Sequence, residues 1–484
     1  MLRPSIQIKL RDSKNTFNYK LSKFHPQTQL EKDLEGIFFR TDERDALNQK
    51  KNMINQQHST KEWDKAKKLT NPYELIHIPN RKIKSESISR YDPLSRSFFK
   101  LWELINHFDL IRDRSPITTA HLAEGPGGFL EAVLFFRQRI IKIYPLQDHY
   151  YGITLNPYSK EIPGWNKASG IIKQYRKNIE IDYGIDQTGD LYKVQNIRSF
   201  SDKVMNNNIN NNNNDNLNSN GAELVTADGG FDFSVDFNQQ EQLAHRLIIA
   251  QLITGIRSQK MGGSLICKFF DTYTYVSAEL LYFVSCLYEE VNLVKPQTSR
   301  PANSEKYLVA IGYKGFPNKN SENYYLKQME NLLDQWDEIN NKGLVIKSIF
   351  DHPPQFFMDL LGLYNSASYK QQIAYVDYTL NIIKNKPDWK QMEMILDFQV
   401  KKATEWCQYY HLSVNLESYF YQKYLHRLKI KNDSNYKPSK TYLNYLNGLD
   451  QYFENFVGYQ DTYLDTYLDT HLDTHYENII SFND

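Results

Sequence analysis

Four ionisable side chains stand at the ends of predicted helices and strands, where groups that hold or transfer protons would face a bound substrate. They are Lys100, Asp228, Lys268 and Glu305. Lys268 is the hardest to explain as a surface residue, because it interrupts the apolar run SLICKFF at residues 264–270. A charge there is costly unless it faces a site or a carboxylate. Lys100 on a helix and Glu305 beside Lys306 each have an ordinary explanation as exposed surface charges.

A glycine-rich turn, EGPGG at residues 124–128, is the second feature that suits chemistry. Glycines let a backbone turn sharply and come close to a ligand. Taken alone, the turn fits a dinucleotide, a nucleotide, an adenosyl cofactor or a purely structural bend. A dinucleotide-dependent dehydrogenase is disfavoured, since the G-x-G-x-x-G pattern is absent and Pro126 lies inside the turn.

The elements that must position these residues alternate between helix and strand. Helices are predicted over 94–111, from Phe129 to 140, over 239–259 with Gly262 and Gly263 ending it, and over 275–290. Strands are predicted over 117–123, 149–155, 222–227, 264–270 and 307–313. This alternation predicts an α/β fold whose sheet is mostly parallel or mixed and is covered by helices on both faces.

Composition divides the chain into five segments. Residues 1–90 are polar and read as a loosely structured N-terminal extension with one strand candidate, IQIKL; residues 91–316 form the α/β domain, and 335–460 a second, mostly helical domain. The asparagine tract at 205–221 is predicted to be a disordered insertion, and 461–484 a low-complexity tail. Lysines between residues 40 and 90 form either a phosphate-facing surface or a solvated face, the latter being favoured.

Bulk properties exclude several classes of protein. The 58 Lys and Arg residues nearly balance the 57 Asp and Glu residues, so no global field indicates nucleic acid. Three widely spaced cysteines, Cys267, Cys286 and Cys407, predict a reducing compartment and no zinc or disulfide framework. The N-terminus lacks an apolar signal core and no stretch approaches about 18 apolar residues, so we expect a soluble intracellular chain without a membrane span.

Six motifs together resemble a known family. In order they are SRSFFKLWEL, AEGPGGF, TGDL, LVTADGGFD, GGSLICKFFD and SRPANSEKYLVAIGYK, within residues 90 to 315. Their order and spacing are similar to those of the FtsJ-like ribose 2′-O-methyltransferases, specifically the mRNA cap enzymes of eukaryotes and large DNA viruses. The resemblance implies a Rossmann-like methyltransferase sheet and transfer of a methyl group from S-adenosyl-L-methionine to a ribose 2′-hydroxyl near the 5′ cap. Its catalytic Lys-Asp-Lys-Glu tetrad matches Lys100, Asp228, Lys268 and Glu305.

The same resemblance implies roles for individual residues. Lys268 would be the general base, with its pKa lowered by burial, by Lys100 and by the sulfonium of the cofactor, while Asp228 and Glu305 orient the lysines and limit that lowering. No metal is required. The implied cofactor residues are Gly125, Pro126, Gly127, Gly128, Phe129, Leu155, Asp190 and Asp228. Asp190 in TGDL has the alternative of an ordinary turn aspartate.

Several alternatives stay open from sequence. SRPANSE resembles enzymes that act on the first transcribed nucleotide, whereas HLAEGPGGF, TLNPY and LVTADGGFD resemble those acting on the second; the first is slightly favoured. Rival functions are 2′-O-methylation of ribosomal or transfer RNA and non-catalytic binding of capped RNA. The expected partner is the 5′ end of capped mRNA, with the transcription or capping machinery as a further candidate. A cellular enzyme would act in the nucleus and a viral one in the host cytoplasm.

Overall fold

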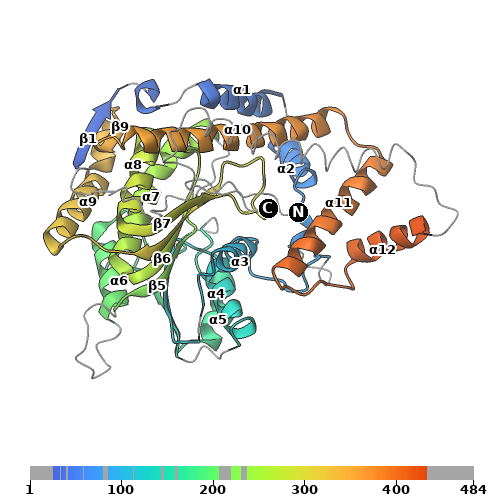
Figure 1. Ribbon diagram of the computed structural model, residues 1–484, viewed down its shortest axis with the longest axis horizontal. Helices are drawn as coiled ribbons and strands as arrows, with labels where there is room; N and C mark the ends of the chain where they lie inside the picture. Colours follow the sequence, from blue (N-terminus) through green and yellow to red (C-terminus); the bar gives the residue numbers. More distant parts are fainter. Residues whose placement is uncertain are drawn as a thin grey trace, which may run out of the picture.

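The structure is a computed structural model that describes ten stretches of the chain (Figure 1). They are residues 25–32, 34–39, 42–57, 59–79, 86–112, 114–142, 147–158, 162–206, 220–230 and 237–432. The strand candidate IQIKL, most of the asparagine tract, residues 433–460 and the tail 461–484 lie outside these stretches. Within them, no helix is long and apolar enough to cross a bilayer.

A seven-stranded sheet with the strand order β4-β3-β2-β5-β6-β8-β7 forms the centre of the molecule. Its five parallel strands are β2 (Thr118–Leu122), β3 (His149–Ile153), β4 (Ile179–Asp182), β5 (Ala222–Ala227) and β6 (Gln259–Phe269). At the other edge, β8 (Lys306–Tyr313) runs antiparallel to both β6 and β7 (Tyr288–Val294). The predicted α/β fold with a mixed, mostly parallel sheet is confirmed.

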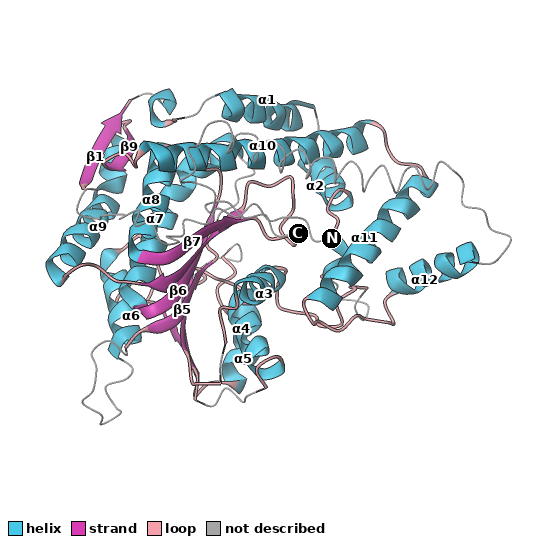
Figure 2. Cartoon of the chain, in the orientation of Figure 1, coloured by secondary structure: helices cyan, strands magenta, loops and turns pink. Residues whose placement is uncertain are grey.

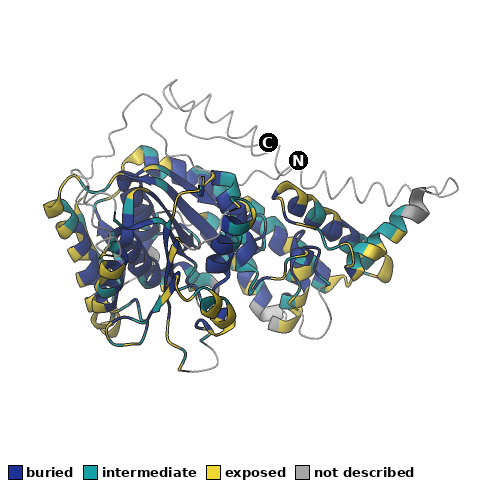
Figure 3. Ribbon diagram, turned by 90° about the horizontal axis from the view of Figure 1, so that it is seen from below, coloured by how far each residue is buried: buried dark blue, intermediate teal, exposed yellow. Residues whose placement is uncertain are grey.

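Helices cover both faces of this sheet (Figure 2). The helices of one face are α6 (Val194–Asn206), α7 (Gln240–Ser258), α8 (Tyr275–Leu287) and α9 (Lys319–Asn341). The helices of the other are α3 (Ser97–Phe108), α4 (Gly128–Arg139) and α5 (Ser169–Gln174). Helix α11 (Trp389–Tyr409) lies beside the sheet and contacts α3 through Trp406 and Phe99, and α12 (Tyr419–Asn432) packs on α11. The strands are consequently buried from both sides (Figure 3), and nearly every residue of β2, β3, β5 and β8 is buried.

The N-terminal and C-terminal parts of the chain pack against each other. Strand β1 (Pro26–Glu31) pairs antiparallel with β9 (Val345–Phe350) in a separate two-stranded sheet. Helices α1 (Asp42–Gln57) and α2 (Thr60–Leu69), blue in Figure 1, pack on α10 (Gln355–Lys384), orange.

Helices α1 and α2 correct the prediction that residues 1–90 are loosely structured. Helix α2 begins with a capping box between Ser59 and Glu62, and Trp63 and Ala66 are buried. The apolar residues are too sparse to show a helical period in the sequence. Helices α1 and α2 are stabilised instead by packing against α10, which lies about 300 residues further along the chain.

The predicted separation between an α/β domain ending at 316 and a helical domain starting at 335 does not divide the core. Helix α9 begins at Lys319, and Leu326, Leu333 and Phe357 belong to the same buried cluster as strands β5 and β6. Helix α9 and the first turns of α10 therefore belong to the helix layer on that face of the sheet.

Further element assignments also differ from the sequence prediction. Helix α7 ends at Ser258, because β6 already begins at Gln259 and pairs with Ala222; Gly262, with φ +76°, lies inside that irregular strand. Helix α8 ends at Leu287, where pairing of Tyr288 with Tyr313 starts β7. Elements β4, α5 and α6 are absent from the prediction.

Candidate active site

The four predicted catalytic residues reach the same edge of the sheet from four different elements. Asp228 follows the last residue of β5, and Lys268 is the penultimate residue of β6. Because β8 runs antiparallel to β6, its first residues pair with the last residues of β6, with Lys268 opposite Tyr307. Glu305 immediately precedes β8 and so arrives at this edge too. Lys100, in the first turn of α3, approaches from the helix layer.

The side chains form one continuous network of alternating charge. The Lys100 Nζ atom lies 2.7 and 2.8 Å from the two carboxylate oxygens of Glu305. Lys268 Nζ lies 3.6 Å from Glu305 Oε2 and 2.7 Å from Asp228 Oδ1, and it donates to the Asp228 backbone carbonyl over 2.9 Å. The tetrad inferred from the family resemblance is therefore assembled as one cluster.

Burial makes these charges strongly interdependent. Only 11–14% of each side chain is exposed. Burial lowers the pKa of Lys268, but the charges of Asp228 and Glu305 outweigh it, so the net pKa is raised. Burial raises the pKa of Glu305, yet Lys100 and Lys268 hold it well below its usual range. In the protein without its ligands the two carboxylates therefore raise the pKa of Lys268, whereas the expected lowering depends on the sulfonium charge of a bound cofactor as well.

Three further residues support the tetrad and were missed from the sequence. Tyr307 donates its hydroxyl hydrogen to Asp228 Oδ1 over 2.7 Å, and Ser299 donates to Glu305 Oε1 over 2.7 Å. Lys295 Nζ donates to the Glu305 carbonyl over 2.8 Å, and burial together with Lys306 and Lys100 lowers its pKa to about 7 despite the attraction of Glu305. The sequence did contain a signal for Tyr307. It follows Glu305 by two residues, and in a strand residues two apart point to the same side. Ser299 and Lys295 carried no such signal.

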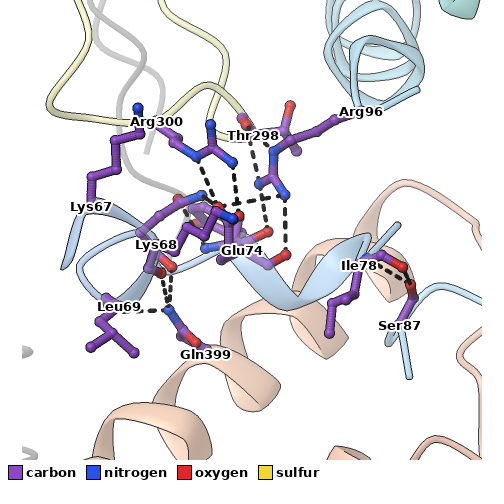
Figure 4. Close-up of polar contacts among 12 residues, drawn as sticks. Lys67, Lys68, Leu69, Glu74, Ile78, Ser87, Arg96, Thr298, Arg300 and Gln399 are labelled. Carbon is purple, nitrogen blue, oxygen red and sulfur yellow. Dashed lines mark hydrogen bonds and ion pairs between the residues drawn. The ribbon is translucent and has the colours of Figure 1, made fainter. Parts of the chain in front are cut away.

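An arginine pair ties the loop before Glu305 to the N-terminal segment (Figure 4). Arg300 binds both carboxylate oxygens of Glu74, at 2.8 and 3.1 Å, and Arg96 donates to the carbonyls of Tyr73, Glu74 and Thr298. Burial raises the pKa of Glu74, but Arg96 and Arg300 lower it to about 2 overall. This carboxylate is therefore charged in neutral solution and anchors the loop.

The glycine turn lies at the same sheet edge, between β2 and α4. Gly127, with φ +104°, starts α4, which has no side-chain cap among the described residues. A Cβ atom on Gly125 would lie 2.7 Å from the Gly164 carbonyl, and one on Gly128 would overlap the hydroxyls of Ser95 and Ser97. At both positions the backbone comes close to other parts of the protein itself. A purely structural bend, one of the explanations that the sequence left open for these glycines, therefore accounts for them. Pro126 forms a cis peptide bond with Gly125, and the Phe129 side chain is buried 5.9 Å from the ring centre of Tyr307.

The segments of Leu155 and Asp190 meet beside this turn. Asn156 donates its amide hydrogen to the Thr188 carbonyl, and Gly189 sits so close to the Thr154 carbonyl that no side chain would fit. Leu155 is exposed. The Asp190 carboxylate accepts from the Tyr192 amide over 2.9 Å, so it serves a turn whatever else it binds.

A buried carboxylate in the glycine turn has spare capacity for a ligand. Glu124 is 3% exposed; its Oε2 atom contacts His121 over 3.0 Å, while Oε1 has no partner among the described residues. The Nε2 atom of Gln251 is likewise unpartnered there, although its Oε1 accepts from the amide of Gly229. An unmatched acceptor and an unmatched donor beside Asp228 fit a bound molecule with both an ammonium and a carboxylate, as in the methionine part of S-adenosylmethionine.

Comparisons with known proteins agree with this geometry. Residues 93–313 match the FtsJ-like methyltransferase family. The cap-specific mRNA (nucleoside-2'-O-)-methyltransferase 1 of Dictyostelium discoideum is 32% identical over 258 residues, which are 51% of this chain but only 31% of that protein. The protein of the same name from Trypanosoma brucei brucei is 29% identical over 294 residues, covering 60% of this chain and 72% of that one.

Among solved structures, a putative ribosomal RNA methyltransferase from Plasmodium falciparum is 14% identical with a TM-score of 0.30, covering 46% of this chain and 99% of that chain. That likeness is too low to support any conclusion. The family match spans all four tetrad residues and the whole seven-stranded sheet. Residues 93–313 of this chain are therefore an FtsJ-like methyltransferase domain.

Proposed function

We propose that this chain transfers a methyl group from S-adenosylmethionine to the ribose 2′-hydroxyl of a 5′-terminal transcribed nucleotide of capped mRNA, preferring the first nucleotide to the second. The observation that carries the proposal is the continuous network of Lys100, Glu305, Lys268 and Asp228 at the carboxyl edge of the sheet. The names of the Dictyostelium and trypanosome relatives support the choice of substrate. This chain spans less than a third of the Dictyostelium protein, so the substrate needs a direct test.

The proposed roles follow from the charge pattern. A ribose hydroxyl is a weak nucleophile until a base takes its proton, and a neutral Lys268 is the base in this scheme. Asp228 and Glu305 hold Lys268 in place but favour its charged form. Lys100 balances one of these carboxylates and lies where it can stabilise negative charge developing on the ribose oxygen.

The cofactor would be held at the adjoining part of the same edge. Glu124, Gln251 and the backbone of Gly125–Gly128 would bind its amino-acid part, with Leu155 and Asp190 at its adenosyl part and Asp228 between cofactor and tetrad. When bound, S-adenosylmethionine supplies the methyl group and a positive sulfonium charge. Added positive charge beside Lys268 would oppose the effect of the carboxylates and favour the neutral amine.

The deciding experiment follows labelled methyl transfer to three short RNAs with one sequence and different 5′ ends. They are uncapped, capped, and capped with the first ribose already 2′-O-methylated. We expect label on the capped RNA and little on the premethylated one. Label on the premethylated RNA would move the site to the second nucleotide, and label on uncapped structured RNA would indicate ribosomal or transfer RNA. Cofactor binding without transfer to any RNA would contradict the proposal and favour a non-catalytic protein.

A further inference from the structure

A pocket of about 300 Å³ opens directly beside the tetrad, and segments outside the family domain build much of its wall. Lys268, Glu305 and Gly230 line it on the side of the sheet. The opposite lining comes from Lys51 and Ile54 of α1, Trp63 and Lys67 of α2, and Gln372 and Val376 of α10. None of these six residues lies within the matched residues 93–313.

One wall of the pocket is apolar. Ile54, Trp63, Ala302 and Val376 line it and belong to a single buried cluster. Four uncharged polar side chains, Gln240, Asn303, Ser304 and Gln372, belong to the same lining. An apolar surface with a few polar groups near it is what a nucleobase needs for binding.

Three lysines of the lining, Lys51, Lys67 and Lys268, carry positive charge, and Glu305 carries negative charge. Lys51 is 6% exposed and pairs with Asp271 over 2.9 Å. Burial raises the pKa of Asp271, but Lys51, Lys306 and Lys295 together lower it, so three lysines act on one carboxylate. Lys51 and Lys67 are the cationic side chains on the part of the pocket built by α1 and α2, and such groups attract an anion such as a phosphate.

Lys67 is the lining cation that is best placed to meet a ligand from solution. It has about a fifth of its side chain exposed, and its one ion pair among the described residues is with Asp64 of its own helix over 2.5 Å, a contact that can exchange at little cost. Figure 4 shows Lys67 extending from α2 toward the side where Arg300 lies. The helix is fixed from behind, since Gln399 of α11 donates to the carbonyls of Lys68 and Leu69.

We propose that this pocket binds one nucleotide of the RNA substrate, with the base against the apolar wall and a phosphate at Lys67, so that α1, α2 and α10 complete the substrate site. The inference rests on the proposed function, because a ribose whose hydroxyl faces Lys268 places the rest of its nucleotide in the adjoining space. The volume stands at the lower end of the range for ligand pockets and suits a single nucleotide.

The test compares two lysines of the same helix. Lys67→Gln removes the lining charge, whereas Lys65→Gln removes an equal charge from an exposed position outside the lining. Binding of a fluorescent short capped RNA is measured by anisotropy over a range of salt concentrations. We expect Lys67→Gln to weaken binding several-fold at low salt and to reduce the slope of log K against log salt by about 0.7, the value for one phosphate on a single strand.

Lys65→Gln is expected to leave affinity and slope unchanged, and both variants should bind labelled S-adenosylmethionine as the wild type does. A second variant, Trp63→Phe, keeps an aromatic ring on the apolar wall. RNA should change the tryptophan emission of the wild type more than that of this variant. Equal effects of the two lysine substitutions, or no effect of either, would overturn the pocket assignment.

The two proposals fail in different ways. If the wild type methylates RNA while Lys67→Gln binds and methylates equally well, the pocket assignment is wrong and the proposed function stands. If RNA binds in a Lys67-dependent manner but no RNA is methylated, the pocket stands and the proposed function is wrong. If the wild type binds no RNA, both are wrong.

Discussion

Lys268 and Tyr307 are opposite each other on neighbouring antiparallel strands, and both donate to the same oxygen of Asp228 at 2.7 Å. Two donors on one carboxylate oxygen hold Asp228 in a single orientation between the sheet and the glycine turn. The side chain at the junction of the catalytic and cofactor regions is therefore positioned by strand register.

Replacing Lys268 by methionine should reduce methyl transfer by about 10²-fold or more, because the proposed base is lost while a chain of similar length is kept. The measurement is the initial rate with labelled cofactor at saturating RNA. Lys260→Met, at the start of the same strand and paired with Glu223 away from the tetrad, is the matched control. Wild-type activity in Lys268→Met would eliminate Lys268 as the base.

Tyr307→Phe should lower kcat by about tenfold with little change in the KM for RNA. The ring stays in place, but Asp228 loses a hydrogen bond from a neutral donor to a charged acceptor, a loss of about 1.5 kcal/mol. Steady-state kinetics test this, with Tyr313→Phe on the same strand as the control. A rise in KM alone would instead assign Tyr307 to RNA binding.

The pH dependence of transfer reports on the charge around Lys268. Its raised pKa in the ligand-free protein predicts that kcat rises with pH over some part of about pH 6 to 10, because the neutral amine is the active form. Glu305→Gln removes a negative charge that favours the ammonium, so the midpoint of this rise should move to lower pH. The exposed substitution Glu338→Gln should not move it. A midpoint that moves upward in Glu305→Gln would contradict the assignment.

Glu103 should make folding stability depend on pH. It is buried and accepts from the Gln297 amide over 2.7 Å and from Trp406 Nε1 over 3.3 Å; burial raises its pKa to about 7 although these bonds lower it. The folded state then holds a proton that the unfolded state releases above about pH 4.5. The stabilising contribution is complete below that pH and is lost as pH rises through about 7.

Urea unfolding at about pH 5 and 8 tests this linkage. The wild type should exceed Glu103→Gln in unfolding free energy by more at the lower pH, and the difference should change by at most about 3 kcal/mol between the two. The exposed substitution Glu405→Gln on α11 should show no such change. A difference that grows with pH would mean that Glu103 is charged in the folded protein.

The sequence alone determined the alternating strands and helices, the mixed sheet and the family, because apolar periodicity and six ordered motifs are local properties. It also predicted a site at Lys100, Asp228, Lys268 and Glu305, and the structure brings these four side chains into one cluster. The residues that the sequence analysis missed depend on contacts between distant segments. The register of β8 against β6 places Tyr307 beside the tetrad, and the ion pair with Glu74 holds Arg300. Two carboxylates that lie close to Lys268 decide the direction of its pKa shift. Helices α1 and α2 form because their apolar residues are buried against α10. All of these features are consequences of tertiary packing, because the spacing of two distant residues in the sequence does not determine the distance between them in the folded protein.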